Sequence, residues 1–239
     1  MRAFIPSAGL GTRLRPLTDT MPKALVPVDG VPMLESVIRR LQSAGYDDFV
    51  INVHHFADQI EDFLKANDGF GSRFRISDER DLLRETGGGI RHAAQLLFDA
   101  PQGRFLVHNV DISSDVDIRA FDAQFERYGA GRQHVADLLV SERETSRYLL
   151  FDDSMQLAGW MNVATGEVRS PQADFDPSKC RRAAFSGIYN LSTDILPLMQ
   201  DCPERFSIVD FLLDKCASYG IRGILAEGAR VTDLGKKAQ

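Results

Sequence analysis

The chain has 239 residues, of which 44% are hydrophobic and 26% are charged, values that are ordinary for a globular protein with an apolar core. Its formal net charge of −6 argues against broad nucleic-acid binding, because nucleic-acid-binding proteins present a basic face to phosphates. No apolar run reaches the about 18 residues that a membrane-spanning helix needs, and the N-terminus lacks the layout of a signal peptide. Three widely spaced cysteines suit reduced thiols in the cytoplasm. We therefore expect a cytoplasmic protein that binds neither nucleic acid nor membranes.

Strand and helix patterns alternate along the first half of the chain. Short apolar runs predict strands and helical spacing predicts helices, in the order strand 3–6, helix 32–44, strand 49–53, helix 57–66, strand 74–77, helix 89–98 and strand 104–108. This alternation predicts a mainly parallel sheet with right-handed crossovers. Ligands of such sheets bind beyond the carboxyl ends of the strands. The loop after the first strand, residues 85–89 and Asp111 should therefore share one rim.

The pattern changes from about residue 134. Strands are predicted at 135–140, 148–151, 157–161 and 183–191, with little helix between them. These strands indicate an antiparallel insertion that forms a wall over the rim. A helix at 208–219 and a strand near 221–226 then return to the main layer. We expect one continuous α/β domain over residues 1–239, with a first part at about 1–133, the insertion at about 134–205 and the return at 206–239.

The loop after the first strand carries the strongest signal in the sequence. Small residues over Ser7–Gly11 let the main chain approach a ligand closely, and free N–H groups at such a turn favour anions. The cations Arg13, Arg15 and Lys23 follow, and they would neutralise more than one phosphate. A G-x-G pair alone is most often an ordinary turn, and the Walker and dinucleotide fingerprints both fail, the latter at Leu14. The loop therefore indicates a triphosphate held against main chain.

The longer pattern resembles the signature of the sugar-1-phosphate nucleotidyltransferases. The matching segments are Gly9-Leu10-Gly11-Thr12-Arg13, Pro16-Leu17-Thr18, Pro22-Lys23 and Pro27-Val28. The resemblance implies a Rossmann-like three-layer α/β fold, the nucleotide-diphospho-sugar transferase fold, with a mainly parallel sheet and an antiparallel sugar-binding insertion. It also implies that the first loop holds the nucleotide and that two of its neighbours contact phosphates during catalysis. The implied nucleotide-binding residues here are Ala8, Gly9, Gly11 and Thr12, with Arg13 and Lys23 as the catalytic cations.

Two aspartates are the candidate metal ligands. Asp111 follows an apolar strand, a position suited to Mg²⁺, which prefers hard oxygen ligands; a turn or capping aspartate is the simpler alternative, since Asp115 and Asp117 follow. The resemblance favours the metal role and makes Asp111 catalytic, although relatives have glycine where this chain has Val110. Asp233, in the segment V-T-D-L-G-K, resembles the acid of the family's D-V-G-T motif, which completes the Mg²⁺ site. A solvated acid near a chain end is the alternative for Asp233.

The segment Glu85-Thr86-Gly87-Gly88-Gly89 is a third candidate. Three successive glycines ahead of a helix are costly in chain entropy. They provide either a flat surface for a base or ribose, or a helix start packed tightly against a neighbour. The segment resembles the nucleoside-binding segment of the muramic-acid and heptose branches of the family. The resemblance therefore assigns Glu85, Thr86, Gly87 and Gly88 to the nucleoside, and Asn109 is a further nucleotide-binding candidate.

The candidate sugar site lies in the insertion. Ser186 and Gly187 resemble the family strand whose glycine backs the sugar, whereas an S-G pair in a strand is otherwise most often a bulge. Glu167 follows a Thr-Gly turn, and some relatives bind sugar hydroxyls with an acid in this region; a solvated turn residue is the alternative. The basic residues open to the second phosphate are Arg2, Arg143, Arg147 and Lys179, and the sequence does not choose among them.

The resemblance implies an enzyme that uses Mg²⁺ to transfer a nucleotidyl group from a nucleoside triphosphate to a sugar 1-phosphate. The expected substrates are UTP and N-acetylmuramate 1-phosphate. A mannose- or heptose-1-phosphate guanylyltransferase is the first alternative. The second is a catalytically weak regulator that binds nucleotide sugars, supported by Val110, by Lys236 in place of the family's threonine, and by a C-terminus that ends sooner than in relatives.

Overall fold

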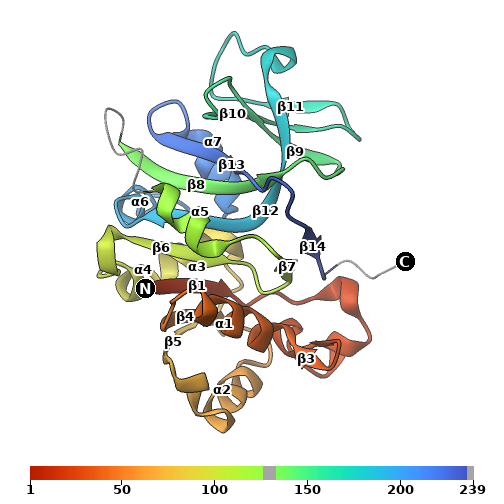
Figure 1. Ribbon diagram of the computed structural model, residues 1–239, viewed down its shortest axis with the longest axis vertical. Coiled ribbons are helices and arrows are strands. Elements are labelled where there is room, and N and C mark those ends of the chain that lie inside the picture. The colour runs from red at the N-terminus through yellow and green to blue at the C-terminus, as the bar shows by residue number, and fades with distance from the viewer. Residues whose placement is uncertain (126–132, 236–239) are drawn as a thin grey trace.

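The computed structural model describes residues 1–125 and 133–235 (Figure 1), so Lys236 lies outside the described residues. Its main sheet has ten strands: β1 (Arg2–Pro6), β4 (Asp48–Val53), β5 (Arg73–Asp78), β6 (Arg104–His108), β8 (His134–Ser141), β9 (Arg147–Phe151), β10 (Leu157–Asn162), β11 (Glu167–Arg169), β12 (Arg181–Ser192) and β13 (Gly220–Leu225). Neighbouring strands follow the order β11-β10-β9-β12-β6-β1-β4-β5, and β8 pairs with both β12 and β13.

The strand directions match the predicted architecture. β1 runs parallel to β4 and β6, β4 to β5, and β8 to β13. β12 runs antiparallel to both β6 and β8, so it alone is reversed in the central layer of the described chain. β9, β10 and β11 continue from β12 as antiparallel neighbours and rise above the main layer in Figure 1. The predicted mainly parallel sheet with an antiparallel insertion is therefore confirmed.

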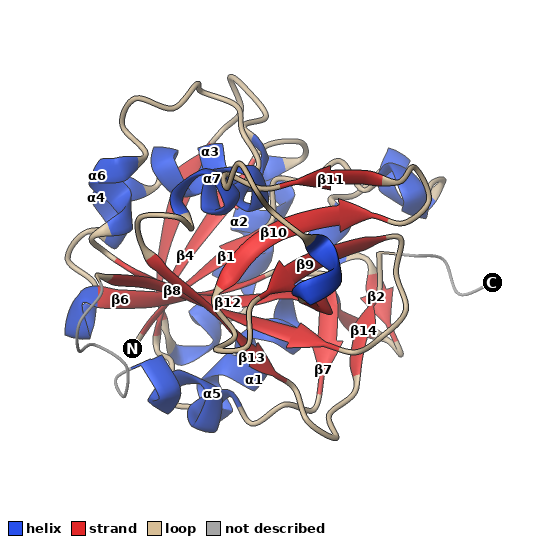
Figure 2. Ribbon diagram, turned by 90° about the horizontal axis from the view of Figure 1, so that it is seen from above, coloured by secondary structure: helices blue, strands red, loops and turns tan. Residues whose placement is uncertain are grey.

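Helices cover both faces of the central sheet. They are α1 (Met33–Ser43), α2 (Ala57–Ala66), α3 (Glu85–His92), α4 (Ala94–Leu97), α5 (Ile118–Phe125), α6 (Ile195–Leu198) and α7 (Ile208–Lys215). Phe4 of β1 packs in the cluster that includes α3, α4, α6 and α7, whereas Ala3 and Ile5 pack with α1, α2 and α5. Figure 2 shows α3, α4, α6 and α7 on one side of the sheet and α1 and α5 on the other. Alternating side chains thus give the strand two buried faces. No helix of the described chain is both long and apolar enough to cross a membrane.

The glycine run differs from its prediction. It does not precede a helix, because α3 begins at Glu85 and includes all three glycines. A Cβ atom on Gly87 would lie 2.4 Å from the Phe206 ring, and one on Gly88 would lie 2.4 Å from the carbonyl oxygen of Glu204. Gly87 and Gly88 thus allow the helix start to pack tightly against residues 204–206, and a Cβ on Gly89 would lie 2.9 Å from Asn52 Nδ2 and from Glu79 Oε1. The predicted helix start at residue 89 is wrong.

Other boundaries also differ. The helix predicted to reach residue 219 ends at Lys215, and Glu167 begins β11 instead of lying in a turn. Five short strands were not predicted: β11, β2 (Pro27–Val28), β3 (Val31–Pro32), β7 (Ile112–Ser114) and β14 (Val231–Asp233). Strands of two or three residues carry too little side-chain alternation for a sequence pattern to reveal them.

His108 ends β6 and is completely buried. Its Nδ1 atom lies 2.9 Å from the backbone oxygen of Asn109. Burial lowers the pKa of His108 from 6.5 to about 4, because the charged imidazolium loses its hydration, and the nearby Arg40 charge acts in the same direction. The folded protein therefore holds this ring neutral at pH values at which the unfolded chain would protonate it.

This pKa difference predicts a stability loss in mild acid. Stability from the neutral ring is present above about pH 6.5 and is lost as the pH falls towards 4, because the unfolded state then binds the proton more readily. The His108→Asn variant keeps a side-chain donor but cannot bind this proton. Between pH 7 and pH 5, we expect its free energy of unfolding to fall by about 2 kcal/mol less than that of the wild type. Urea unfolding at both pH values measures the difference. His55→Asn, at an exposed histidine, should behave as the wild type, and equal losses in all three proteins would contradict the assignment.

Candidate active site

A cavity of about 380 Å³ lies beyond the carboxyl ends of β1, β4 and β6. Its lining residues are Pro6, Ser7, Ala8, Gly9, Lys23, Asn52, Leu83, Glu85, Thr86, Asn109, Val110, Asp111 and Ser207. The first loop, the start of α3 and the loop after β6 therefore meet around one space, as the strand order predicts. We refer to it as the rim cavity.

The first loop is anchored from below by a buried polar chain. The N–H of Ser7 donates to Asn52 Oδ1 at 2.6 Å, and Asn52 Nδ2 donates to Glu79 Oε1 at 2.8 Å. Glu79 is completely buried, and this burial raises the pKa of its carboxyl. Beyond this anchor, the N–H groups of Ala8 and Gly9 donate to no acceptor in residues 1–125 and 133–235. Free N–H groups in a loop beside cations suit an anionic ligand.

Gly11 shapes the turn that follows. Its φ is +62°, in the left-handed region, and a Cβ there would lie 2.8 Å from Thr18 Cγ2 and 2.9 Å from Lys23 Cβ. Thr18 Oγ1 also donates to the Gly11 carbonyl at 2.9 Å. A short 3₁₀ helix, η1 (Thr12–Leu14), begins immediately afterwards and presents Arg13. Gly11 therefore lets the loop fold closely over Lys23.

Asp111 and Asp233 meet although they lie far apart in the sequence. β7 and β14 pair antiparallel, with Asp233 opposite Ile112, and Leu234 N–H donates to the Asp111 carbonyl at 2.8 Å. Figure 1 shows the two strands side by side at the edge of the main layer. A Cβ on Gly235 would lie 2.6 Å from Asp111 Oδ2 and 3.2 Å from Asp233 Oδ1. Both carboxylates thus face the space that this glycine leaves open.

Two cations accompany the two acids. Lys23 Nζ forms an ion pair with Asp111 Oδ2. Arg13 Nη1 lies 3.8 Å from Asp233 Oδ2, and its side chain is 57% exposed, so it is free to reorient towards a ligand. No group of three or more acidic, histidine or cysteine side chains that could hold a metal ion exists in the described chain. Two carboxylates and no sulfur or imidazole form a donor set that fits Mg²⁺, which completes its shell with water and phosphate oxygens.

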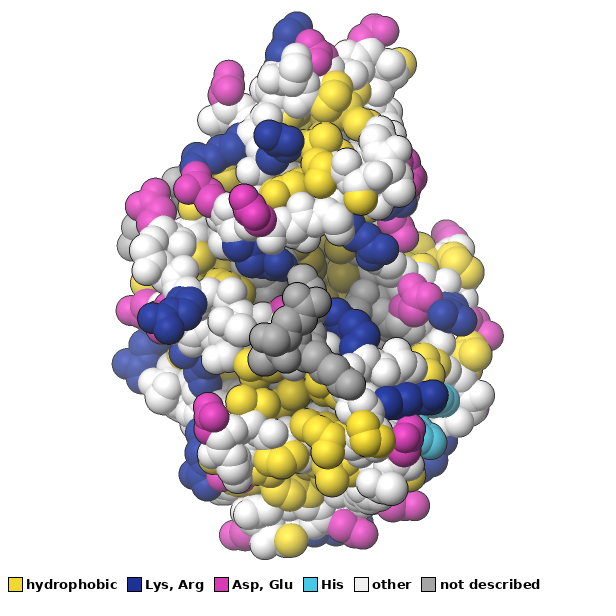
Figure 3. All heavy atoms as spheres, turned by 90° about the vertical axis from the view of Figure 1, so that its right-hand side faces the viewer, with side chains coloured by type: hydrophobic (Ala, Val, Ile, Leu, Met, Phe, Trp, Pro, Cys, Tyr) yellow, Lys and Arg dark blue, Asp and Glu magenta, His cyan; other side chains and the backbone are white. Residues whose placement is uncertain are grey.

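A larger cavity, of about 900 Å³, adjoins the rim cavity beneath the insertion, and the two share Glu85 and Ser207. We refer to it as the insertion cavity. Arg13, Glu167 and Asp233 are among its lining residues. Figure 3 shows Lys and Arg side chains around the hollow between the insertion and the main layer. The two acids therefore stand where a ligand in one cavity would meet a ligand in the other.

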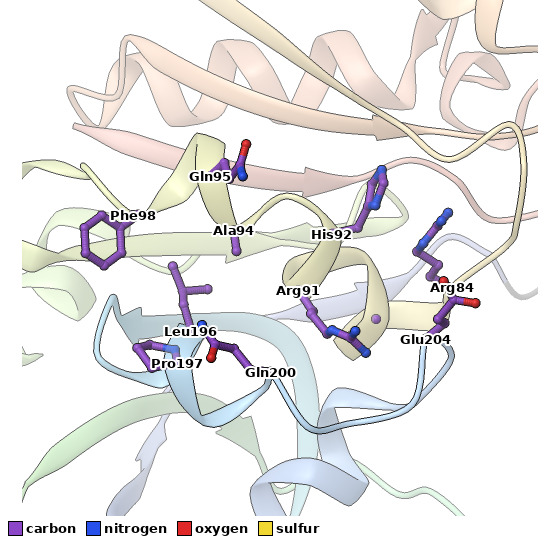
Figure 4. Close-up of a pocket in the computed structure, with 11 residues that line it drawn as sticks. Arg84, Arg91, His92, Ala94, Gln95, Phe98, Leu196, Pro197, Gln200 and Glu204 are labelled. Atoms are coloured by element: carbon purple, nitrogen blue, oxygen red, sulfur yellow. The ribbon is translucent and has the colours of Figure 1, made fainter.

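Several predicted residues do not line either cavity. Gly11 shapes the turn after the first loop, Thr12 is an exposed residue at the start of η1, and Gly87 packs against Phe206. Gly88 lines a different cavity of about 520 Å³, on the far face of α3, with Arg84, Arg91 and Phe98 (Figure 4). The glycine run therefore supports the rim cavity from beneath and provides no flat surface inside it.

Ser186 and Gly187 form the junction behind the cavities. The pairing of β12 with β8 shifts register between Phe185 and Tyr189, so the bulge that an S-G pair suggests is present. Gly187 has a φ of +73°, and a Cβ there would lie 2.7 Å from Asn109 Nδ2. The Asn109 N–H donates to the Gly187 carbonyl at 2.9 Å. Ser186 is completely buried, so its side chain does not face a ligand in this conformation.

Comparison with known proteins identifies the family. The sequence model described as Nucleotidyl transferase matches residues 2–152, which include the first loop and Asp111. The chain belongs to the nucleotidyl transferase family. The resemblance noted from the first loop is therefore confirmed.

Individual relatives agree with this membership. The chain is 42% identical over 146 residues, or 60% of its length, to an N-acetylmuramate alpha-1-phosphate uridylyltransferase of Caulobacter vibrioides. It is 40% identical over 136 residues, or 57% of its length, to the Neisseria meningitidis protein of the same name. These alignments span 59% and 56% of the two relatives. A mannose-1-phosphate guanylyltransferase catalytic subunit beta of Danio rerio is 35% identical over 87% of this chain and 58% of that relative.

Solved structures share the fold. A UDP-glucose pyrophosphorylase in complex with UDP-glucose superposes with a TM-score of 0.76 at 17% identity, covering 98% of this chain and 93% of that one. A putative glucose-1-phosphate thymidylyltransferase of Bacillus anthracis gives a TM-score of 0.79 at 17% identity, covering 99% and 91%. The nucleotide-diphospho-sugar transferase fold expected from the sequence is therefore confirmed.

Sequence reasoning missed several residues that line the rim cavity in this nucleotidyl transferase. Asn52 was assigned only to a buried strand, although a polar side chain within an apolar run is a signal of a special contact. Ser207 accepts from the Val209 N–H at 3.2 Å and caps α7, and a serine before an apolar helix marks such a cap. Leu83 carried no signal, because it precedes α3 in a loop without a pattern.

The two loop glycines allow a matched test of the turn. Gly11→Ala should lower the free energy of unfolding by about 1–3 kcal/mol, because the new Cβ meets Thr18 and Lys23 in a left-handed backbone. Gly9→Ala is the control, since nothing lies within 4 Å of a Cβ there, and it should stay within about 0.5 kcal/mol of the wild type. Urea unfolding of the three proteins decides, and equal stability for both variants would show that Gly11 is not required.

Proposed function

We propose that this protein is an enzyme that transfers a nucleotidyl group from a nucleoside triphosphate to a sugar 1-phosphate and releases pyrophosphate, with UTP and N-acetylmuramate 1-phosphate as its substrates. The observation that carries the proposal is the meeting of Asp111 and Asp233, each beside a cation, between two adjoining cavities. The names of the Caulobacter and Neisseria relatives support the choice of base and sugar.

The rim cavity provides for the nucleoside triphosphate. Free N–H groups of Ala8 and Gly9 would hold phosphate oxygens, and Lys23 lies at the same wall. Glu85 and Thr86 lie across the cavity at the start of α3, where they would contact the nucleoside, as would Asn109. Gly11, Gly87 and Gly88 would then shape this cavity from outside it.

The chemistry requires no protein nucleophile. An oxygen of the sugar phosphate attacks the α-phosphorus, the new P–O bond forms, and the bond to the bridging oxygen of pyrophosphate breaks. Arg13 and Lys23 would stabilise the negative charge that builds up on pyrophosphate, and the cavities would hold both reactants in line. Mg²⁺ on Asp111 and Asp233 would supply neutralisation of the phosphate charges that otherwise repel each other. Glu167 and Gly187 would contact or back the acceptor sugar.

A guanylyltransferase for mannose or heptose 1-phosphate is the second candidate. The zebrafish relative, which is named as a mannose-1-phosphate guanylyltransferase subunit, aligns over 87% of this chain, a longer span than the two N-acetylmuramate uridylyltransferases. A panel that crosses UTP, GTP, CTP and dTTP with N-acetylmuramate, mannose and heptose 1-phosphates distinguishes the candidates through released pyrophosphate. We expect release with UTP and N-acetylmuramate 1-phosphate, dependent on Mg²⁺ and abolished by EDTA. A preference for GTP would support the second candidate instead. No pyrophosphate release with any pair of nucleotide and sugar phosphate would indicate a protein that binds nucleotide sugars without turnover.

Single substitutions test the charged centre. Lys23→Ala and Asp111→Asn should each lower turnover at least about 10²-fold, because a lost charge contact in a site that excludes water costs about 3 kcal/mol. The matched controls are Lys65→Ala and Asp62→Asn, at exposed residues of α2, and both should retain full activity. Circular dichroism and thermal unfolding verify the fold of each variant. Near-normal turnover in Asp111→Asn would remove this acid from the mechanism.

A further inference from the structure

The arginine side chains that line the insertion cavity fall into two groups: those that pair with an acid, and those that have no acid partner in the described chain. The charged side chains that line it are Arg13, Arg143, Arg147, Arg169, Glu85, Glu167, Asp210 and Asp233. Arg169 is fully engaged, because it lies 2.7 Å from Asp210 and 3.5 Å from Glu167. Its guanidinium also stacks on Trp160, with 4.0 Å between its Cζ atom and the ring centroid. Arg169 therefore belongs to the wall of the cavity.

The two remaining acids are paired as well: Glu85 with Arg205 at 2.8 Å and Asp233 with Arg13 at 3.8 Å. Arg143 and Arg147 are left, and neither forms an ion pair with an acid in the described parts of the chain. An arginine is much less hydrated than a lysine and offers a planar pair of donors. Two such groups without acid partners in one cavity favour a ligand with anionic oxygens.

The two arginines lie on different parts of the cavity. Arg143 donates to the Phe185 carbonyl at 3.1 Å, two residues from Gly187, and it also lines a cavity of about 520 Å³ together with Val231 of β14. It is therefore held near the acids of the reaction centre. Arg147 begins β9 within the insertion, where it pairs with Asn162 of β10. Asn162 pairs in turn with Glu167 of β11, so Arg147 belongs to the row of side chains predicted to face the sugar.

We propose that Arg147 binds a carboxylate carried by the sugar, so that the preferred acceptor is an acidic sugar 1-phosphate. This inference rests on the proposed function. Arg143, near the acids, serves the phosphate end of the acceptor, and Arg147 then has no phosphate to neutralise. A guanidinium binds a carboxylate through two parallel N–H···O bonds. N-acetylmuramate carries such a group as an ether-linked lactate, whereas N-acetylglucosamine is the same sugar without it.

The matched sugars give a direct test. The wild type should use N-acetylmuramate 1-phosphate about 10- to 100-fold better than N-acetylglucosamine 1-phosphate, as measured by kcat/KM with UTP. Arg147→Gln should remove most of that preference by raising KM for the acidic sugar, and it should leave the neutral sugar unchanged. Arg147→Lys should restore part of the preference, because it keeps the charge and loses the bidentate geometry. Arg39→Gln, on the exposed face of α1, is the control for loss of a surface guanidinium.

Two outcomes would overturn the inference. One is a wild type that does not discriminate between the two sugars, and the other is an equal loss on both sugars in Arg147→Gln, which would make Arg147 a phosphate ligand. Calorimetric binding of UDP-N-acetylmuramate and UDP-N-acetylglucosamine separates this inference from the proposed function, because it needs no turnover. Weaker binding of only the acidic nucleotide sugar by Arg147→Gln supports carboxylate recognition even if no pyrophosphate is released. Unchanged binding of both by that variant overturns it.

Discussion

The antiparallel pairing of β7 with β14 is the constraint on which the candidate site depends. It brings Asp233 beside Asp111 through main-chain contacts, including the 2.8 Å hydrogen bond from Leu234 N–H to the Asp111 carbonyl. Two carboxylates at such close range repel each other, and the repulsion grows as water is excluded. Backbone pairing therefore holds the two acids together although their side chains repel each other, and Lys23 and Arg13 offset this repulsion.

The same cations give the centre two alternative sets of partners. In the protein alone, the acids neutralise Lys23 and Arg13. Under the proposed function, the phosphates of a bound nucleoside triphosphate would pair with the lysine and the arginine, and Asp111 and Asp233 would hold the divalent ion. Each charged side chain would have an oppositely charged partner both without and with the ligands, so the fold would not have to bury an unpaired charge in either state. A Cβ on Gly235 would meet both acids, so this glycine keeps the space between them open.

Periodicity predicted the main layer well, because its elements are long and buried on defined faces. The helix expected at 57–66 matches α2, and motif spacing placed Lys23 and Asp111 around one cavity. The pairing of β7 with β14 was beyond sequence reasoning, since three-residue strands have no pattern and pairing between distant segments leaves no local signal. The glycines of α3 signalled a close approach, but only the packing of Phe206 and Glu204 shows what approaches.

The long strand β12 explains how one sheet serves two cavities. Its last residues, Ile188–Ser192, pair with β6 in the central layer, whereas Arg181–Ala183 pair with β9 of the insertion. Between these two segments the register shifts at the bulge that contains Gly187. A residue with a side chain would be strained there by the positive φ and would also collide with Asn109. Gly187 therefore lies at the joint between the insertion and the central layer. Under the proposed function, this backbone joint would set the angle between the wall that faces the sugar and the rim that holds the phosphates.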